Sequence, residues 1–225
     1  MPQDEGSVKP GGARAARRAE RRAEMVEAAM AAVREHGPGV SVAEMAASAG
    51  ITKPVLYRHF TDRADLQLAV GRRAAEDLMA KMAPALMEDL APVDQIAGVV
   101  DAFLAGIEEE PQLWRFVVHN TVEREAGGEV VEDVRAQIAQ LLAQLIGARL
   151  RSAGKDSGAA EAWAYGLVGM VQSAGDWWLE RQTMSRADLT RYLTALIWNG
   201  AAGVLGEEGA PGKVLQLIPK EGTGG

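Results

Sequence analysis

The stretch SVAEMAASAGITKPVLYRHF, residues 41–60, constrains the fold more than any other part of this sequence. Ser41 precedes an apolar residue and Glu44 follows it by three positions, a spacing typical of a capping box, which satisfies free amide groups at a helix start. Gly50 can take the left-handed conformation that a tight helix exit needs. Thr52 is placed to cap the next helix, whose first turn tolerates Pro54. The stretch therefore predicts two short helices joined by a tight turn.

These two helices have an apolar inner side and a polar outer side. The residues available for the inner side are Val42, Met45, Ala46, Ile51, Val55, Leu56 and Phe60, and those left outside are Thr52, Lys53, Tyr57, Arg58 and His59. This is the helix-turn-helix arrangement, in which an apolar back holds a recognition helix whose polar front donates hydrogen bonds in a DNA groove. Each residue also has an ordinary alternative: Lys53 and Arg58 as solvated charges, and Tyr57 as a half-buried packing residue.

The rest of the sequence predicts helices only, because alanine is abundant and apolar residues recur at three- and four-residue intervals. We predict an all-α protein of about nine helices. Besides the two short helices, their expected ranges are 17–35, 63–82, 93–107, 112–124, 129–151, 159–181 and 186–205. The first should bury Met25, Val26, Ala29, Met30 and Val33, and the helix from Glu129 should bury Val131, Val134, Ile138, Leu141 and Leu145.

These elements predict four segments along the chain. A disordered N-terminal arm spans residues 1–13 and a three-helix helix-turn-helix domain spans 14–66. A larger helical domain follows over 67–206, and a mobile C-terminal tail spans 207–225, in which only VLQLI is expected to pack locally.

Composition narrows the possible chemistry. Cysteine is absent, which rules out disulfides, thiolate zinc sites and cysteine nucleophiles. The three histidines, at positions 36, 59 and 119, are too widely spaced to suggest a metal site, and we expect no metal and no cofactor. No signal-type segment and no run of about 18 apolar residues is present, so we expect a cytoplasmic chain with no membrane partner.

The net charge of −7 conceals an asymmetry along the chain. Residues 1–73 hold 12 Lys and Arg against 9 Asp and Glu, whereas the remaining residues hold 12 against 22. Five arginines, at positions 14, 17, 18, 21 and 22, fall within nine residues. They could neutralise nucleic-acid phosphates, or they could form a solvated, disordered arm.

Residues 41–66, SVAEMAASAGITKPVLYRHFTDRADL, resemble the TetR-type transcriptional regulators. The small-residue turn, the Tyr-x-His-Phe motif and the basic residue just beyond it carry the resemblance. It implies a DNA-binding domain followed by a helical ligand-binding and dimerisation domain. The expected function is that of a homodimeric repressor on a pseudo-palindromic duplex operator, with a small hydrophobic effector changing its affinity.

The resemblance also implies roles for individual residues. Thr52, Lys53 and Pro54 would open the recognition helix and face the bases, while Tyr57 and His59 would bind phosphate. Ser41 and Arg63 would touch the DNA backbone, and Arg58 would contact either a base or a phosphate. The arm containing Arg17 and Arg18 would reach an adjacent minor groove.

The second domain offers candidates for an apolar cavity with a few polar anchors. They are Phe103, Ile107, Trp114, Val117, Asn120, Trp163, Val168, Val171, Gln172 and Asp176. The tryptophans could equally be core or dimer-interface residues, and Asp176 could lie at a wet edge. The stretches FLAGIEEEPQLWRFVVHN and GLVGMVQSAGDWWLERQTMSRADL resemble actinobacterial TetR-type regulators of lipid metabolism, which makes a fatty acyl-CoA the specific effector candidate.

The family implies dimerisation, and the last two helices should provide it as a four-helix bundle. The expected interface residues are Trp178, Leu189, Tyr192, Leu193, Leu196 and Trp198. The competing interpretation is an all-helical enzyme or lipid carrier with a hydrophobic cavity. The sequence contains no nucleophile elbow, phosphate loop or paired-carboxylate motif to support it, so we expect no enzyme.

Overall fold

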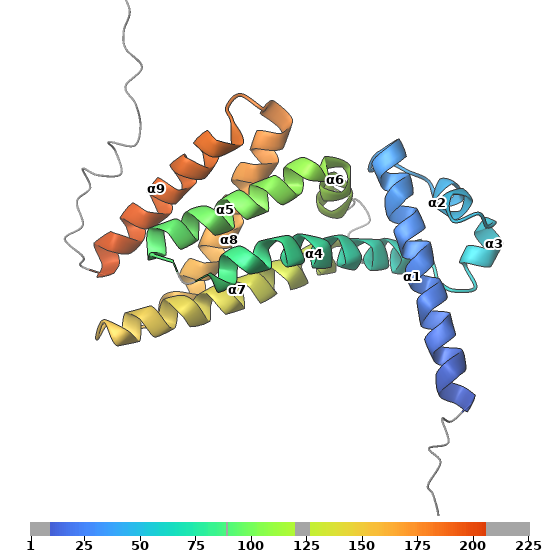
Figure 1. Cartoon of the computed structure of the whole chain (residues 1–225), viewed down its shortest axis with the longest axis horizontal. Coiled ribbons are helices and arrows are strands. Elements are labelled where there is room, and N and C mark those ends of the chain that lie inside the picture. Colours follow the sequence, from blue (N-terminus) through green and yellow to red (C-terminus); the bar gives the residue numbers. More distant parts are fainter. Residues whose placement is uncertain (1–9, 89, 120–126, 206–225) are drawn as a thin grey trace, which may run out of the picture. The chain divides into compact units, whose positions relative to one another are not determined.

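Figure 1 shows the computed structural model of the chain, which describes residues 10–88, 90–119 and 127–205. Over these ranges the chain forms nine α-helices and no strand, which confirms the all-α prediction. The helices are α1 (Pro10–His36), α2 (Val42–Ser48), α3 (Lys53–Leu56), α4 (Arg63–Met87), α5 (Pro92–Glu109), α6 (Pro111–His119), α7 (Gly127–Ser152), α8 (Ala160–Arg181) and α9 (Arg186–Leu205). None of them is long and apolar enough to cross a membrane.

The largest differences from the predicted ranges are at the start of α1 and the end of α4. The first helix begins at Pro10 and not at Arg17: residues 13–16 are alanine and arginine, which are strong helix formers, and proline is tolerated in the first turn. Residues 10–13, which were expected to be disordered, are therefore helical, while residues 1–9 lie outside the described part. The third helix is a single helical turn, and α4 continues through Pro84 to Met87.

The chain divides into two compact units. The N-terminal unit comprises residues 1–76 and 112–131, and the C-terminal unit comprises residues 77–111 and 132–225. The predicted boundary between residues 66 and 67 therefore differs from the observed division in two ways. The first ten residues after that boundary belong to the N-terminal unit, and so does nearly all of α6.

The core of the N-terminal unit combines the predicted inner faces of α1, α2 and α3. Its buried residues are Met25, Val26, Ala29, Met30, Ala32, Val33, Val40, Val42, Met45, Ala46, Leu56, Phe60, Leu66, Val70, Leu113 and Phe116. Helices as short as α2 and α3 are not stable alone in water, so this shared core fixes their conformation. Each large apolar side chain buried there contributes about 1.5–3 kcal/mol.

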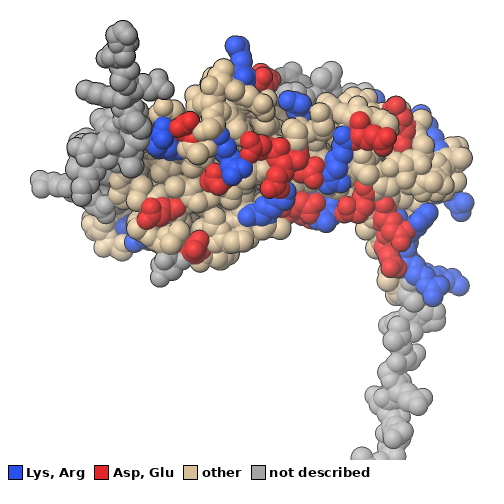
Figure 2. All heavy atoms as spheres, turned by 45° about the horizontal axis from the view of Figure 1, so that its top comes forward, with Lys and Arg blue, Asp and Glu red and all other residues tan. Residues whose placement is uncertain are grey.

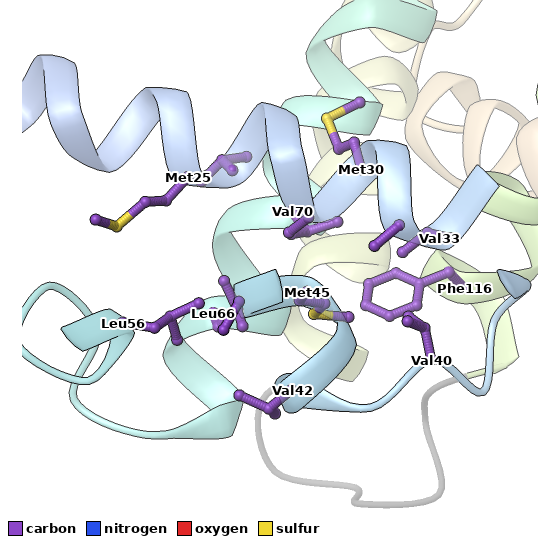
Figure 3. Close-up of a cluster of buried hydrophobic side chains, with 14 of the residues drawn as sticks. Met25, Met30, Val33, Val40, Val42, Met45, Leu56, Leu66, Val70 and Phe116 are labelled. Atoms are coloured by element: carbon purple, nitrogen blue, oxygen red, sulfur yellow. The ribbon is translucent and has the colours of Figure 1, made fainter. Parts of the chain in front are cut away.

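Helix α6 supplies two residues to that core. Leu113 and Phe116 are only 3% and 2% exposed, and Figure 3 shows the Phe116 ring beside Val33 and Val40. Val117 packs against the same cluster. The sequence alone could not show this, because α6 follows α5 along the chain but belongs to a different compact unit.

In the C-terminal unit, α5 packs mainly against α9 and also against α8. Arg186, at the start of α9, joins the two helices: its Nε lies 3.0 Å from Asp101 Oδ1 and its Nη1 lies 2.7 Å from Glu108 Oε2. Gly175 of α8 allows close approach, since a Cβ there would lie 2.8 Å from Ile107 Cδ1.

The predicted core stripe of α7 is wrong in part. Leu141 and Leu145 are 36% and 45% exposed, whereas Ala139 and Leu150 of the same helix are buried. The buried side of α7 is therefore turned away from the stripe that its leucines suggested, and tertiary packing decided which side faces inward.

Candidate nucleic-acid interface

The start of α2 is fixed by the predicted capping box. The Glu44 amide donates to Ser41 Oγ at 3.3 Å, and the Ser41 amide donates to Glu44 Oε2 at 2.7 Å. Hydrogen bonding to the Ser41 side chain, and then to its backbone, lowers the pKa of the Glu44 carboxyl group. Ser41 is exposed and its hydroxyl proton is not used by the cap, so it can still donate to an outside acceptor.

The turn between α2 and α3 also follows the sequence prediction. Gly50 has a φ of 66°, in the left-handed region, and its amide donates to the Ala47 carbonyl at 2.9 Å. Thr52 is the N-cap residue of α3 in backbone conformation, but its side chain makes no capping hydrogen bond, so that part of the prediction is wrong. Pro54 lies in the first turn of α3, as predicted.

Helix α3 presents a polar surface on an apolar base. Leu56 is 0% exposed, while Thr52, Lys53, Pro54 and Arg58 are exposed. Tyr57 is half-buried and packs against the core of the N-terminal unit. The Lys53 ammonium lies 5.8 Å from the centroid of the Tyr57 ring, within reach of a cation–π contact that restricts the lysine side chain.

His59 is half-buried and its two ring nitrogens differ. Nδ1 is buried and has no hydrogen-bond partner among the described residues. A proton on Nδ1 would therefore be left without an acceptor, so Nε2 is the better placed of the two ring nitrogens to carry a donor proton. Only Nε2 is then suited to donate to an outside phosphate.

The loop from α3 to α4 is organised by two aspartates. Asp62 Oδ1 accepts the Asp65 amide at 2.8 Å, as expected of a cap for α4. Asp65 Oδ2 accepts the Thr61 amide at 3.0 Å, and Asp65 Oδ1 accepts from Arg22 Nη2 of α1 at 2.5 Å. The Arg22 guanidinium also lies 4.5 Å from the centroid of the Phe60 ring. Arg63, next to this junction, is exposed.

The sequence reasoning missed Arg22 and Asp65 as a pair. They are 43 positions apart, and only the general rule that a half-buried arginine needs a carboxylate could have suggested them. A second contact joins α1 to the turn after α3, since Arg18 Nη2 lies 3.4 Å from the Arg58 carbonyl oxygen. Figure 2 shows a group of basic side chains at the N-terminal end of α1, with acidic side chains beside it.

The predicted ligand-binding residues are divided between the two compact units. Trp114 and Val117 belong to the N-terminal unit, whereas Phe103 and Ile107 are buried in the C-terminal unit, against Gly175. Four residues of α8 are half-buried: Val168, Val171, Gln172 and Asp176. Trp163 on the same helix is 38% exposed, and Asn120 lies outside the described residues.

The predicted dimer residues fall into two sets. Trp178, Leu189 and Leu193 are 2%, 5% and 6% exposed in a single chain, and the Trp178 indole donates to the Met184 carbonyl at 2.8 Å. The chain itself covers these three, so their side chains are not accessible to a second copy, and the prediction that they lie in the interface is wrong. Tyr192 and Leu196 are 40% and 61% exposed on α9, and Trp198 is half-buried.

The capped α2, the left-handed turn and the short, polar-fronted α3 define a helix-turn-helix DNA-binding protein with a larger helical domain. A family model described as "Bacterial regulatory proteins, tetR family" matches residues 25–70, and one described as "Tetracyclin repressor-like, C-terminal domain" matches residues 81–213. The chain belongs to the TetR family of transcriptional regulators. It is accordingly a DNA-binding regulator and not an enzyme.

Curated relatives and solved structures agree with this family. An uncharacterized HTH-type transcriptional regulator of Mycobacterium tuberculosis is 35% identical over 187 residues, which cover 83% of this chain and 79% of the relative. The HTH-type transcriptional activator FasR of Mycolicibacterium smegmatis is 26% identical, with coverage of 83% and 85%. A tetR-family regulator from Streptomyces coelicolor has the same fold, with a TM-score of 0.66, 20% identity and coverage of 91% and 92%.

Proposed function

We propose that this chain is a homodimeric repressor that binds a pseudo-palindromic DNA operator through α3. Its affinity for the operator changes when a small hydrophobic effector binds the C-terminal unit. The observation that supports it best is the exposure of Thr52, Lys53 and Pro54 at the start of a helix whose back, Leu56, is completely buried. A rigid apolar base lets these exposed groups contact base edges without first being ordered.

The residues around α3 are suited to holding the DNA backbone. Tyr57 can donate its phenol proton and His59 its Nε2 proton to phosphate oxygens. Ser41 and Arg63 flank them at the starts of α2 and α4, where their exposed side chains can reach further phosphates. Arg58 is exposed and can contact either a base or a phosphate.

The DNA contacts can be tested on a duplex that the wild-type chain selects from a random-sequence pool. We expect Lys53→Ala to weaken binding and to relax the preference at one or two base pairs. Tyr57→Phe should weaken binding similarly on all duplexes, because it removes only a phosphate donor. Arg149→Ala, at an exposed residue of the C-terminal unit, is the control and should bind normally. Wild-type affinity in both site variants would contradict the assignment.

The dimer is proposed on the exposed parts of α8 and α9. Trp177 is 43% exposed on α8, and Tyr192 and Leu196 are 40% and 61% exposed on α9. Isolated surface apolar residues are ordinary, but large ones on two consecutive helices favour burial against a second copy. A two-fold dimer would present two α3 helices about 34–36 Å apart, matching half-sites one helical turn apart.

The effector is proposed to bind the C-terminal unit at the half-buried side of α8 formed by Val168, Val171, Gln172 and Asp176. A fatty acyl-CoA is the specific candidate. A solved structure described as the fatty acid degradation regulator FadR from Bacillus halodurans has a similar fold, with a TM-score of 0.59, 15% identity and coverage of 78% and 93%. At that identity it supports the fold, and the effector class is our proposal.

Effector binding can be followed by tryptophan fluorescence, because Trp163 lies on α8. Long-chain acyl-CoA should shift the emission and change the affinity for the selected duplex, whereas coenzyme A alone should do neither. An effector changes DNA affinity only if it binds the two conformations unequally. An unchanged duplex affinity at saturating acyl-CoA would remove this effector while leaving the DNA-binding role intact.

Repression is proposed because a dimer bound across a promoter excludes polymerase. One curated relative carries the name of an activator, so the direction of regulation needs its own test. Transcription in vitro from a template carrying the selected duplex over the promoter should fall when the chain is added. A rise would make the protein an activator. We place its action in the cytoplasm, where bacterial DNA is accessible.

A further inference from the structure

The N-terminal half of α1 carries a stripe of arginines that the helix-turn-helix does not account for. Arg14, Arg17, Arg18, Arg21 and Arg22 are separated by three and four residues, so their side chains share one side of the helix. This half of α1 begins at Pro10, whereas the family model matches only from residue 25. It is therefore a feature of this chain beyond the matched domain.

The stripe is electrostatically unfavourable in the free protein. Like charges three and four positions apart on a helix repel each other, and cations are disfavoured near a helix N-terminus. The first turn of α1 contains no acidic residue to offset them. The acids on this half of α1 are Glu24, which pairs with Arg21 at 2.5 Å, and Glu20, which is three positions from Arg17 but forms no ion pair with it, so five arginines face two acids. An external polyanion would relieve this repulsion.

Two of the arginines hold the stripe in place. Arg22 is bound to Asp65 and lies over Phe60, and Arg18 contacts the Arg58 carbonyl at the end of the recognition segment. Because these contacts face α3 and the start of α4, the stripe lies on the side of α1 that adjoins the recognition helix. Arg14 lies four residues beyond Arg18, about 6 Å further along the helix axis.

Arg14 and Arg17 have no such contacts. Both side chains are exposed, and no described residue forms an ion pair or hydrogen bond with either. We propose that these two arginines bind phosphates of the duplex beside the bases that α3 reads. The inference rests on the proposed DNA-binding function and extends it by a second contact surface, which adds affinity for any sequence.

Two structural facts fix the kind of contact. A helix with its side chains is about 10–12 Å wide and cannot enter a minor groove about 6 Å wide, so the expected minor-groove arm is replaced by a helix along the backbone. The side of α1 opposite the stripe carries Ala15, Ala16, Ala19 and Ala23, all exposed. Helices that lie on membranes bury large apolar residues there, so DNA is favoured over a lipid surface.

The test compares salt dependence on one duplex, selected by the wild-type chain from a random-sequence pool. Fluorescence anisotropy across a KCl series gives the slope of log K against log salt for the wild type, Arg14→Ala/Arg17→Ala and Arg14→Lys/Arg17→Lys. The control, Arg149→Ala/Arg181→Ala, removes the same charge from exposed positions of the C-terminal unit. Circular dichroism checks that each variant remains helical.

Loss of two phosphate contacts should reduce the slope by about 1.8 per bound chain and weaken binding at least tenfold at low salt. The base preference should not change, and the lysine pair should restore most of the affinity.

An unchanged slope, an equal fall in the control, or an altered base preference would overturn the inference while leaving the proposed function intact. Phosphatidylglycerol vesicle binding lost in the alanine pair, with duplex binding unaffected, would assign the stripe to membranes instead. If the wild type enriches no duplex, the proposed function fails as well.

Discussion

Arg22 of α1 and Asp65 of α4 form the junction that holds the recognition segment, with 2.5 Å between Nη2 and Oδ1. Their side chains are 38% and 30% exposed, so the ion pair alone contributes about 1 kcal/mol or less. Asp65 does more than pair with Arg22, because its second oxygen accepts the Thr61 amide at 3.0 Å. The carboxylate thus joins α1, the loop after α3 and α4.

We therefore expect Asp65→Ala to destabilise the chain more than Arg22→Ala. The first removes both the ion pair and the exposed hydrogen bond to the Thr61 amide, at a cost of about 1–2 kcal/mol, and the second should cost about 1 kcal/mol or less. Urea unfolding of the two variants measures the difference. Equal stabilities would show that the Thr61 contact adds nothing, and a larger loss in Arg22→Ala would show that the arginine and not the aspartate organises the junction.

The capping box of α2 predicts a pH dependence. Because the pKa of Glu44 is lower in the folded chain than its ordinary value of 4.5, the stabilisation is complete above that value and is lost as pH falls through the folded pKa. Thermal unfolding between pH 3 and pH 7 should therefore show a smaller acid-side loss for Glu44→Gln than for the wild type. Parallel curves for the two proteins would rule out this contribution.

Removing the other half of the box has a separate effect. Ser41→Ala should cost about 1 kcal/mol at neutral pH, since the Glu44 amide loses its acceptor. Ala43→Ser, at an exposed position of the same helix, is a suitable control and should have little effect. Denaturant midpoints of the two variants provide the measurement.

Gly175 predicts a steric limit between α8 and α5. A methyl group there would lie 2.8 Å from Ile107 Cδ1 and 3.0 Å from Phe103 Cε1, so Gly175→Ala should destabilise the C-terminal unit by about 1–3 kcal/mol. Gly98 of α5 offers the matched control. A methyl group at that position meets Ala85 Cβ at an ordinary 3.7 Å, and Gly98→Ala should be neutral or slightly stabilising. A stabilised Gly175→Ala variant would mean that α5 and α8 are less closely packed.

The proposed dimer face predicts that a charged substitution on α9 lowers the molecular mass of the protein in solution from that of a dimer toward that of a monomer. Leu196 is 61% exposed on α9, so Leu196→Lys should leave the chain folded while weakening the dimer, as measured by sedimentation equilibrium. Leu145→Lys on α7, at a leucine that is 45% exposed, is the matched control and should remain dimeric. If only the Leu145 variant dissociates, the dimer interface lies on α7 and not on α9.

The local elements were predictable from sequence because their signals are local. Ser41 with Glu44, Gly50 and Pro54 each specify a backbone conformation within a few residues, and all four occur where expected. The associations between distant segments were not predictable. Phe116 packs with Val33, and Trp178 is covered by its own chain, because burial depends on which helices meet and not on apolar spacing alone. The exposed leucines of α7 show the same limit.

The candidate site likewise has features that a local sequence pattern predicts and contacts that it does not. The exposure of Lys53 and Arg58 followed from the helix-turn-helix pattern, whereas the Arg22 and Asp65 pair joins segments 43 positions apart. The arginine-rich arm illustrates both cases. Its charge and the helix over residues 17–35 were predicted from the sequence, but its anchoring by Arg18 and Arg22 depends on contacts between distant segments that no local pattern encodes.

Parallel selections from one random-sequence duplex pool, with the wild type and Lys53→Ala, test the central claim most directly. The account predicts that the wild type enriches an inverted repeat with half-sites about one helical turn apart, and that Lys53→Ala enriches a repeat with the same spacing but with relaxed preference at one or two positions in each half. Enrichment of no sequence by the wild type, or of an identical motif by both proteins, would contradict it.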